Sequence, residues 1–258
     1  MKLTIGMPSY KNYEEVWFTV QSLKLYQDLE DCEILIIDNY GDKNLENFVK
    51  NWANSNVRLI VYKESTGTAA AKNKVFEEAN GEWVLCIDSH VLLVPDSIKK
   101  LKEYIRQNPN CKDLLQGPLL YDDLKSSSDS FNTTWSGGMW GQWSNFRSDR
   151  SVEPYEIPMM GMGLFCCRKD SWLGFNKSFK GFGGEEGYIH EKYRKYGYKT
   201  ICLPWLQWNH YFSPASKPYN PTLEDKARNY IIGFKELGLN MEPLIKEFGL
   251  TLVNRYNR

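Results

Sequence analysis

The sequence predicts one α/β domain with a mainly parallel sheet and helices on both of its faces. Short runs rich in β-branched residues alternate with stretches of helical periodicity through the first half of the chain. With 258 residues, 42% of them hydrophobic and 14% aromatic, the chain can bury a sizeable core. Because strand–helix–strand units cross over with right-handed geometry, we expect parallel strands covered by helices on both sides.

The first four strands are predicted at residues 2–8, 32–38, 57–63 and 82–88. The helices that alternate with them are predicted at residues 13–27, 43–53, 68–79 and 96–107. Sheets of this class bind ligands beyond the carboxyl ends of their strands. Three of the predicted strand ends are polar, and they carry Pro8-Ser9-Tyr10, Asp38-Asn39 and Asp88-Ser89-His90. We therefore expect these residues to face one crevice.

The middle of the chain, residues 122–155, is polar and rich in glycine and serine. It nevertheless carries Trp135, Trp140 and Trp143, which a simple linker would not need. We interpret this segment as a mobile lid that becomes partly ordered over a site. The alternative is a surface insertion whose tryptophans pack on the domain for stability alone.

The stretch "FGGEEGYIHEKYRKYG" predicts a helix that begins after Gly184 and ends near Gly197. Glu185 and Glu186 fall in its first turn, where the positive end of the helix favours carboxylates. A last strand region, residues 200–212, ends near His210 and closes the predicted main domain of residues 1–212. Residues 213–258 are predicted as a helical extension packed on that domain, with amphipathic helices at 223–238 and 241–249.

Composition restricts the class of protein. Lys+Arg and Asp+Glu both number 32, so no global field draws the chain to nucleic acid or to an anionic membrane. The sequence shows neither a signal peptide nor an apolar stretch of membrane-spanning length, so we expect a cytoplasmic protein without a membrane span. Its six cysteines lie mostly in apolar runs without CxxC spacing, which favours reduced thiols over disulfides or zinc sites.

Asp88 and His90 indicate a metal site. In an extended segment residues i and i+2 project to the same face, about 6.5 Å apart by strand rise, so both side chains could converge on one ion. With a distant second histidine they form a nitrogen and oxygen ligand set with open positions, which suits Mn²⁺ better than Mg²⁺. The alternative is that His90 forms an ordinary hydrogen bond to Asp88 or to a loop at the strand end.

In combination, the motifs resemble the GT-A catalytic domain of family-2-type nucleotide-sugar glycosyltransferases. The resemblance is greatest to the polypeptide N-acetylgalactosaminyltransferase branch, and it spans roughly residues 3–212. The motifs that carry it are, in order, "IGMPSYKN", "ILIIDN", "STGTAAAKN", "CIDSH", "MMGMGLFCCRKDSW", "FGGEEGYIHEKYRKYG" and "WNHYF". The fold that it implies is Rossmann-like and agrees with the strand and helix pattern.

The resemblance implies a UDP-sugar donor, a hydroxyl acceptor on a glycan, a protein or a modified DNA base, and Mn²⁺ or another divalent cation. The implied metal ligands are Asp88, His90 and His210. The implied nucleotide-binding residues are Pro8, Ser9, Asp38, Gly67, Lys72 and Asp88. Ser65 and Lys72 stand where the branch usually carries arginine, and Asn39 stands where a second acid is often found. These departures leave the base and the sugar of the donor open.

Glu186 is the predicted catalytic base, with Glu185 as the second candidate. In related inverting enzymes the second acid of this pair deprotonates the acceptor hydroxyl, whereas the retaining branch typically has Asn there. A base within reach of the acceptor proton is what in-line inversion needs, so we expect inversion although the overall resemblance is to retaining enzymes. His190, one turn later, is expected to be a hydrogen-bond partner of the i,i+4 kind on the helix face.

Two other functions remain open from the sequence. A non-catalytic sugar-nucleotide-binding protein would keep Asp38 but would not need the two glutamates together with three metal ligands. A glycosyltransferase acting on a hydroxymethylated base of DNA would use the aromatic lid and the basic tail "NRYNR", although the formal net charge of +0 disfavours binding to DNA.

Overall fold

A computed structural model describes residues 2–52, 56–64, 67–147, 152–212 and 222–256 of the chain. Ser65, which the family resemblance singled out, lies outside these ranges, as do residues 148–151 of the predicted lid and the connection 213–221. Across the described ranges, every helix falls short of the length and apolar character that a bilayer-crossing helix needs. A cytoplasmic location stays a prediction.

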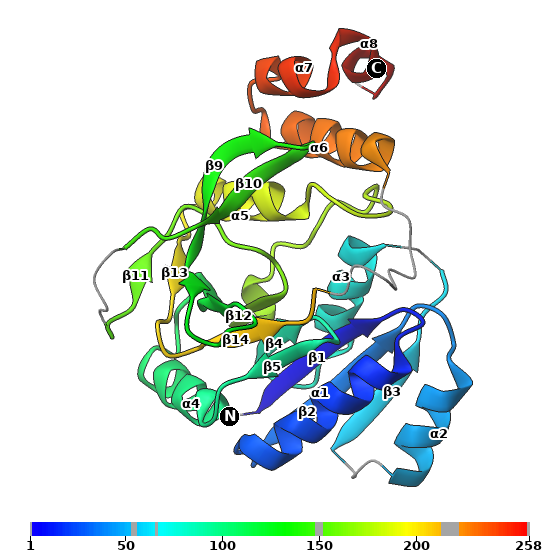
Figure 1. Ribbon diagram of the computed structural model, residues 1–258, viewed down its shortest axis with the longest axis vertical. Coiled ribbons are helices and arrows are strands. Elements are labelled where there is room, and N and C mark those ends of the chain that lie inside the picture. The colour runs from blue at the N-terminus through cyan, green and yellow to red at the C-terminus, as the bar shows by residue number, and fades with distance from the viewer. Residues whose placement is uncertain (1, 53–55, 65–66, 148–151, 213–221, 257–258) are drawn as a thin grey trace.

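The main sheet of the described residues has eight strands and is mostly parallel, as predicted (Figure 1). Parallel pairs join the three N-terminal strands and β4, whereas β12 and β11 run antiparallel to their neighbours. From one edge to the other, the strands are β11 (Tyr155–Glu156), β13 (Thr200–Cys202), β6 (Leu114–Gln116), β12 (Leu164–Arg168), β4 (Trp83–Ile87), β1 (Leu3–Ser9), β2 (Cys32–Asp38) and β3 (Val57–Val61).

Helices cover both faces of this sheet, which confirms the α/β prediction. On one face, α1 buries Val16, Val20 and Leu23, which follow one another at helical spacing. This face also carries α2 and α4, and the opposite face carries α3 and α5 in a second apolar cluster. The bounds are α1 (Tyr13–Tyr26), α2 (Lys43–Trp52), α3 (Thr68–Glu78), α4 (Ser97–Gln107) and α5 (Glu185–Lys195), with a short 3₁₀ turn at Lys169–Ser171. The six cysteines are free, as expected, and all but Cys111 are buried.

A smaller sheet lies beside the end of β4. Its strands are, in order, β5 (Val91–Leu93), β14 (Trp208–His210), β7 (Leu119–Leu120) and β8 (Ser127–Ser128). The strand region predicted at residues 200–212 is therefore two strands in two different sheets, β13 and β14. Antiparallel pairing of β14 with β5 sets His210 opposite Val91, immediately after His90. This pairing brings together two histidines that are 120 residues apart in the chain.

The segment 122–155 is not simply a loop. It contains β8 and an antiparallel hairpin of β9 (Ser130–Ser136) and β10 (Met139–Ser144), which turns at two glycines, Gly137 and Gly138, both with positive φ. Trp135 and Trp140 stack on each other with ring centroids 5.9 Å apart. Trp135 also lies edge-on to Tyr230 at 4.8 Å, so the hairpin is packed on the C-terminal helices. The sequence did not reveal these strands because the exposed residues of β9 are serine and threonine, which local pattern does not separate from a loop.

The C-terminal extension has three helices in its described part, where two were predicted. They are α6 (Leu223–Leu237), α7 (Glu242–Phe248) and α8 (Leu250–Tyr256), and they lie beyond the hairpin at one end of the molecule (Figure 1). Gly249, with φ 82°, lets the chain turn between α7 and α8. Arg255 and Tyr256 of the predicted basic tail both contact Glu224, so this part of the tail is held against α6.

Candidate functional site

The carboxyl ends of β1 and β2 meet side by side, with Ser9 and Asp38 as register partners. Asp38 is fully buried, and its carboxylate accepts hydrogen bonds from the backbone N–H groups of Tyr40, Gly41 and Asp42. It therefore shapes the turn that leads to α2. A carboxylate offers about four lone-pair positions, and hydrogen bonds from the described residues occupy three of them. A nucleotide contact by Asp38 and Ser9 stays a prediction.

Two tyrosines that the sequence analysis did not single out flank this pair of strand ends. The rings of Tyr10 and Tyr40 meet edge to face with centroids 5.8 Å apart, and the ammonium of Lys11 lies 4.8 Å from the Tyr40 ring. Pro8 is half-buried at the end of β1. Gly67, with φ 115°, begins α3 and bridges to Gly181, a close backbone approach that a side chain would prevent.

Asp88, His90 and His210 converge, although not by the route that the sequence suggested. Residues 88–90 form a turn between β4 and β5 and not an extended strand, so the alternation of side chains does not bring Asp88 and His90 together. The turn and the pairing of β14 do so instead. One ligand atom from each of the three residues lies within 4.8 Å of the others.

The donor set fits a divalent transition metal. The Nε2 atoms of His90 and His210 face each other at 3.0 Å, and His210 Nε2 lies 3.5 Å from Asp88 Oδ2. Two imidazole nitrogens that point at one space are compatible only if a proton or a cation lies between them. Two imidazoles and one carboxylate are ligands that Mn²⁺ accepts, and three protein ligands leave positions for other oxygens.

Lys72 lies next to Asp88 in this cluster. Its side chain is 2% exposed, its Nζ is 3.0 Å from Asp88 Oδ1, and it donates a 2.5 Å hydrogen bond to the Met162 carbonyl. Burial disfavours ionisation of Asp88, but the Lys72 ammonium and the contact with His210 outweigh it and hold the pKa of Asp88 well below its usual value. Asp88 is therefore a carboxylate at neutral pH. The nucleotide contact expected of Lys72 stays a prediction, because its ammonium is directed to Asp88.

Glu185 and Glu186 lie where the sequence placed them, in the first turn of α5 after Gly183 and Gly184. Both oxygens of Glu185 and Oε2 of Glu186 are buried without a hydrogen-bond partner among the described residues. Burial raises the pKa of Glu185 to about 8, with the adjacent Glu186 adding to the shift. Burial also raises the pKa of Glu186. A carboxyl group with a raised pKa and free lone pairs is suited to proton transfer near neutral pH.

The hairpin and α6 pack on the start of α5, next to the two glutamates. Trp140 packs so closely on Gly187 of α5 that a Cβ there would overlap its ring. The Trp140 backbone N–H donates to the Tyr230 hydroxyl at 2.8 Å, which fixes the hairpin to α6. Trp143 lies edge-on to Phe131 at 4.6 Å. These contacts favour the alternative of packing for stability for Trp135 and Trp140, and a lid movement stays a prediction.

His190 is a structural partner within α5. It is fully buried, its Nδ1–H donates to the Glu186 carbonyl at 2.5 Å, and its Nε2 accepts from the Gln116 amide at 3.2 Å. Burial lowers the pKa of His190 to about 3, so the ring is neutral. The expected i,i+4 hydrogen bond is thus present, but it reaches the backbone of Glu186 and not its carboxylate.

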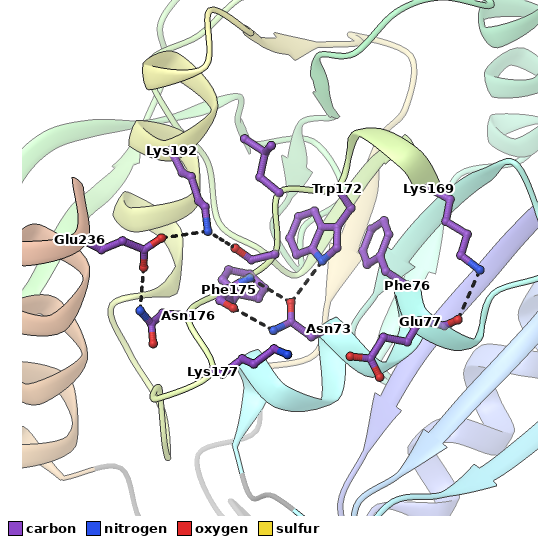
Figure 2. A pocket seen from close by; sticks show the side chains of 12 residues that line it. Asn73, Phe76, Glu77, Lys169, Trp172, Phe175, Asn176, Lys177, Lys192 and Glu236 are labelled. Carbon is purple, nitrogen blue, oxygen red and sulfur yellow. Dashed lines mark hydrogen bonds and ion pairs between the residues drawn. The ribbon is translucent and has the colours of Figure 1, made fainter.

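A separate cavity of about 580 Å³ lies between α3, the segment before α5, and α6 (Figure 2). Several of its polar groups are paired with neighbouring residues. The Asn73 amide oxygen accepts from Trp172 Nε1 and from the Phe175 N–H, and Lys192 lies 3.0 Å from Glu236. The Trp172 ring is stacked on Phe76 at 4.3 Å. We therefore assign no ligand to this cavity.

The sequence analysis missed Glu15 and Asn12, which lie next to the cluster of Asp88, His90 and His210. Glu15 Oε2 lies 3.3 Å from His90 Nδ1, and Asn12 Nδ2 donates to Glu15 Oε2 at 2.8 Å. The signal was the spacing Asn-x-x-Glu at the start of a predicted helix, which is typical of a capping box. In the structure, neither side chain caps the helix in this way.

Residues 4–170 of the chain match the family described as Glycosyl transferase family 2. The chain belongs to glycosyl transferase family 2. Two curated relatives agree with this family. The chain is 28% identical over 108 residues to an "Uncharacterized glycosyltransferase" of Haemophilus influenzae, an alignment that covers 42% of this chain and 36% of that protein.

It is also 28% identical over 107 residues to the "Putative teichuronic acid biosynthesis glycosyltransferase TuaG" of Bacillus subtilis, covering 41% of this chain and 42% of that protein. The matched part thus spans less than half the length of either relative.

Solved structures confirm the GT-A fold. GalNAc-T7, solved with UDP, GalNAc and Mn²⁺, superposes with a TM-score of 0.74 over 91% of this chain and 48% of that chain, at 16% identity. The mannosyltransferase PcManGT of Pyrobaculum calidifontis, solved with GDP-Man and Mn²⁺, has a TM-score of 0.64 at 15% identity and covers 99% of this chain and 69% of that chain. The S. aureus protein TarS superposes with a TM-score of 0.61 at 17% identity, over 99% of this chain and 43% of that chain.

Proposed function

We propose that this family 2 protein is a metal-dependent glycosyltransferase that moves a hexosyl or N-acetylhexosaminyl group from a UDP-sugar to a hydroxyl acceptor. The observation that carries the proposal is the convergence of Asp88, His90 and His210 beside the buried glutamates of α5. Glu186 is near enough to Lys72 and Asp88 for their charges to act on its pKa. Metal ligands and a proton acceptor are therefore grouped at one end of the sheet.

The donor would bind with its nucleoside over the ends of β1 and β2 and its diphosphate at the metal cluster. Candidate nucleotide contacts are Pro8, Ser9, Asp38, Gly67 and Asp88. A divalent cation held by Asp88, His90 and His210 would act as a Lewis acid for the leaving diphosphate. Support for a UDP-sugar comes from GalNAc-T7, solved with UDP and Mn²⁺, and from TarS, solved with UDP-GlcNAc.

In the transfer step, the acceptor hydroxyl gives its proton to the Glu186 carboxylate while its oxygen bonds to the anomeric carbon. The bond between that carbon and the diphosphate oxygen breaks, and its electron pair stays on the departing UDP. A single displacement of this kind inverts the anomeric configuration. The raised pKa of Glu186 makes its carboxylate a stronger base than an exposed glutamate.

The alternatives are less well supported. A protein that only binds sugar nucleotides has no use for three buried carboxylate oxygens, two on Glu185 and one on Glu186, that lack a hydrogen-bond partner among the described residues, since such groups lower stability when they are ionised. The basic tail was one argument for an acceptor on DNA. That argument is weaker because Arg255 of the tail is paired with Glu224 at 3.1 Å. The acceptor hydroxyl, whether on a glycan, a protein or a modified base, is left for acceptor screening to assign.

The proposal is tested by incubating the protein with a panel of UDP-sugars and Mn²⁺ and measuring UDP release. We expect release from at least one donor, loss of release on chelation, and loss in Asp88→Asn. Asp96→Asn is the matched control, because Asp96 is exposed and its left-handed backbone suits asparagine equally well. UDP release that is unchanged in Asp88→Asn would refute the proposal.

A further inference from the structure

The ring of His90 is held between two protein groups. Its Nε2 faces His210 at 3.0 Å, and its Nδ1 lies 3.3 Å from the Glu15 carboxylate on α1. Nδ1 is shielded from solvent, and no hydrogen bond of good angle reaches it from the described residues. Glu15 is therefore the polar group that this nitrogen can use.

Glu15 is itself fixed by a short network. Asn12 Nδ2 donates to Glu15 Oε2 at 2.8 Å and also bonds the hydroxyl of Ser89, in the same turn as His90. Asn12 Oδ1 accepts from the Ser9 hydroxyl at 2.7 Å and from the Tyr10 N–H at 3.0 Å. The network thus connects the end of β1 to the turn that carries His90.

Neither of the other two candidate ligands can orient His90 in place of Glu15. Asp88 Oδ1 is engaged by Lys72 at 3.0 Å, and its Oδ2 faces His210 at 3.5 Å. The Lys72 ammonium offsets part of the charge of Asp88. Glu15 adds a negative charge at Nδ1 of His90, next to a cluster that would bind a divalent cation.

We infer that Glu15 is a positioning residue, which holds the Nδ1–H of His90 and turns its Nε2 toward the space shared with His210 and Asp88. This inference rests on the proposed metal site. Histidine ligands of metals commonly donate their other ring N–H to a carboxylate, and loss of such a partner typically lowers metal affinity about 10- to 100-fold. Glu15 touches neither donor nor acceptor in this role.

The test separates the charge of Glu15 from its hydrogen-bonding ability. Glu15→Gln keeps an acceptor oxygen but removes the charge, whereas Glu15→Leu removes both. Glu14 is an exposed carboxylate in the same first turn of α1, so Glu14→Gln and Glu14→Leu are matched controls. Thermal melting of all four variants confirms that each is folded.

Calorimetric titration of Mn²⁺ in the presence of UDP gives the first readout. We expect roughly tenfold weaker Mn²⁺ binding in Glu15→Gln, a greater loss in Glu15→Leu, and less than about twofold change in the Glu14 variants. Equal affinities in the wild-type protein and both Glu15 variants would overturn the inference and leave the proposed function standing. Absence of Mn²⁺ binding in the wild-type protein would instead overturn the proposed function.

The ¹⁵N chemical shifts of the His90 ring, measured in metal-free protein at one pH, give the second readout and do not depend on activity. We expect the proton on Nδ1 in the wild-type protein and in Glu15→Gln, and its loss from Nδ1 in Glu15→Leu. A wild-type ring with a proton on Nε2 and none on Nδ1 would contradict the inference even if Mn²⁺ binds.

Discussion

Replacement of Glu186 by glutamine is the most informative single change in the proposed enzyme. Glutamine keeps the size and the hydrogen-bonding capacity of the side chain but cannot take the acceptor proton. General-base catalysis is typically worth about 10²- to 10⁴-fold in rate, so we expect transfer by Glu186→Gln to be at least roughly a hundredfold slower. A hundredfold corresponds to about 2.7 kcal/mol in the barrier.

The effect of the same change on folding should be small, because two contributions oppose each other. The favourable interaction of a carboxylate with the helix N-terminus is worth at most about 1 kcal/mol. Against it stands the burial of the carboxylate, which raises the pKa of Glu186 and lowers stability when the group is ionised. A net change within about 1 kcal/mol shifts the melting temperature of a domain of this size by only about 2–4 °C.

The assay is UDP-sugar transfer to an acceptor found by screening, with the anomeric configuration of the product read from NMR coupling constants. Glu191→Gln is the control, because Glu191 lies on the same helix and pairs with Arg194 on the surface. We expect inverted product from the wild-type protein and normal donor binding by Glu186→Gln. Transfer at a near-normal rate by Glu186→Gln would exclude it as the base, and a retained anomer would refute in-line inversion.

Three further predictions concern the metal, the hairpin and pH. His90→Ala or His210→Ala should weaken Mn²⁺ and UDP binding together, while the melting temperature stays near that of the wild-type protein. Calorimetric titration of UDP with and without Mn²⁺ checks this. If UDP binding depends on Mn²⁺ in both variants as it does in the wild-type protein, the prediction is wrong. If residues 122–155 act as a lid, UDP-sugar with Mn²⁺ should slow their cleavage by protease, and equal rates would favour a static insertion. Because the folded pKa of Glu185 is about 8 against an ordinary 4.5, the unfolded chain binds fewer protons between these values, and stability should fall as pH rises through them. Urea unfolding should therefore show that the free energy of unfolding falls less between about pH 5 and pH 8 in Glu185→Gln than in the wild-type protein. If the two proteins lose free energy of unfolding in parallel, Glu185 is not buried as described.

The sequence was most informative where local pattern and tertiary environment agree. The strands β1, β2 and β4 are short, apolar and bounded by polar residues, so their position and parallel arrangement could be predicted from periodicity. The hairpin was missed because its stability comes from tryptophans that pack on α6, a partner about 90 residues away in the chain. The composition of the segment alone could not predict that contact.

The candidate site was predicted in part for the wrong reason. Asp88 and His90 were expected to share a strand face, but a turn brings them together. His210 reaches them through the pairing of β14 with β5. Glu15 could not be singled out, because its importance depends on a contact with His90 across 75 positions of sequence. The pKa shifts of Glu185 and Glu186 likewise depend on tertiary burial, whereas their helix position was predicted correctly.

The pairing of β14 with β5 also has a consequence for synthesis of the chain. Asp88 and His90 leave the ribosome long before His210, and β14 takes its place between β5 and β7, both of which come earlier in the sequence. A nascent chain that ends before β14 therefore holds an incomplete ligand set, however well β1 to β4 have folded. The proposed metal site would be completed late, in the same event that closes the smaller sheet.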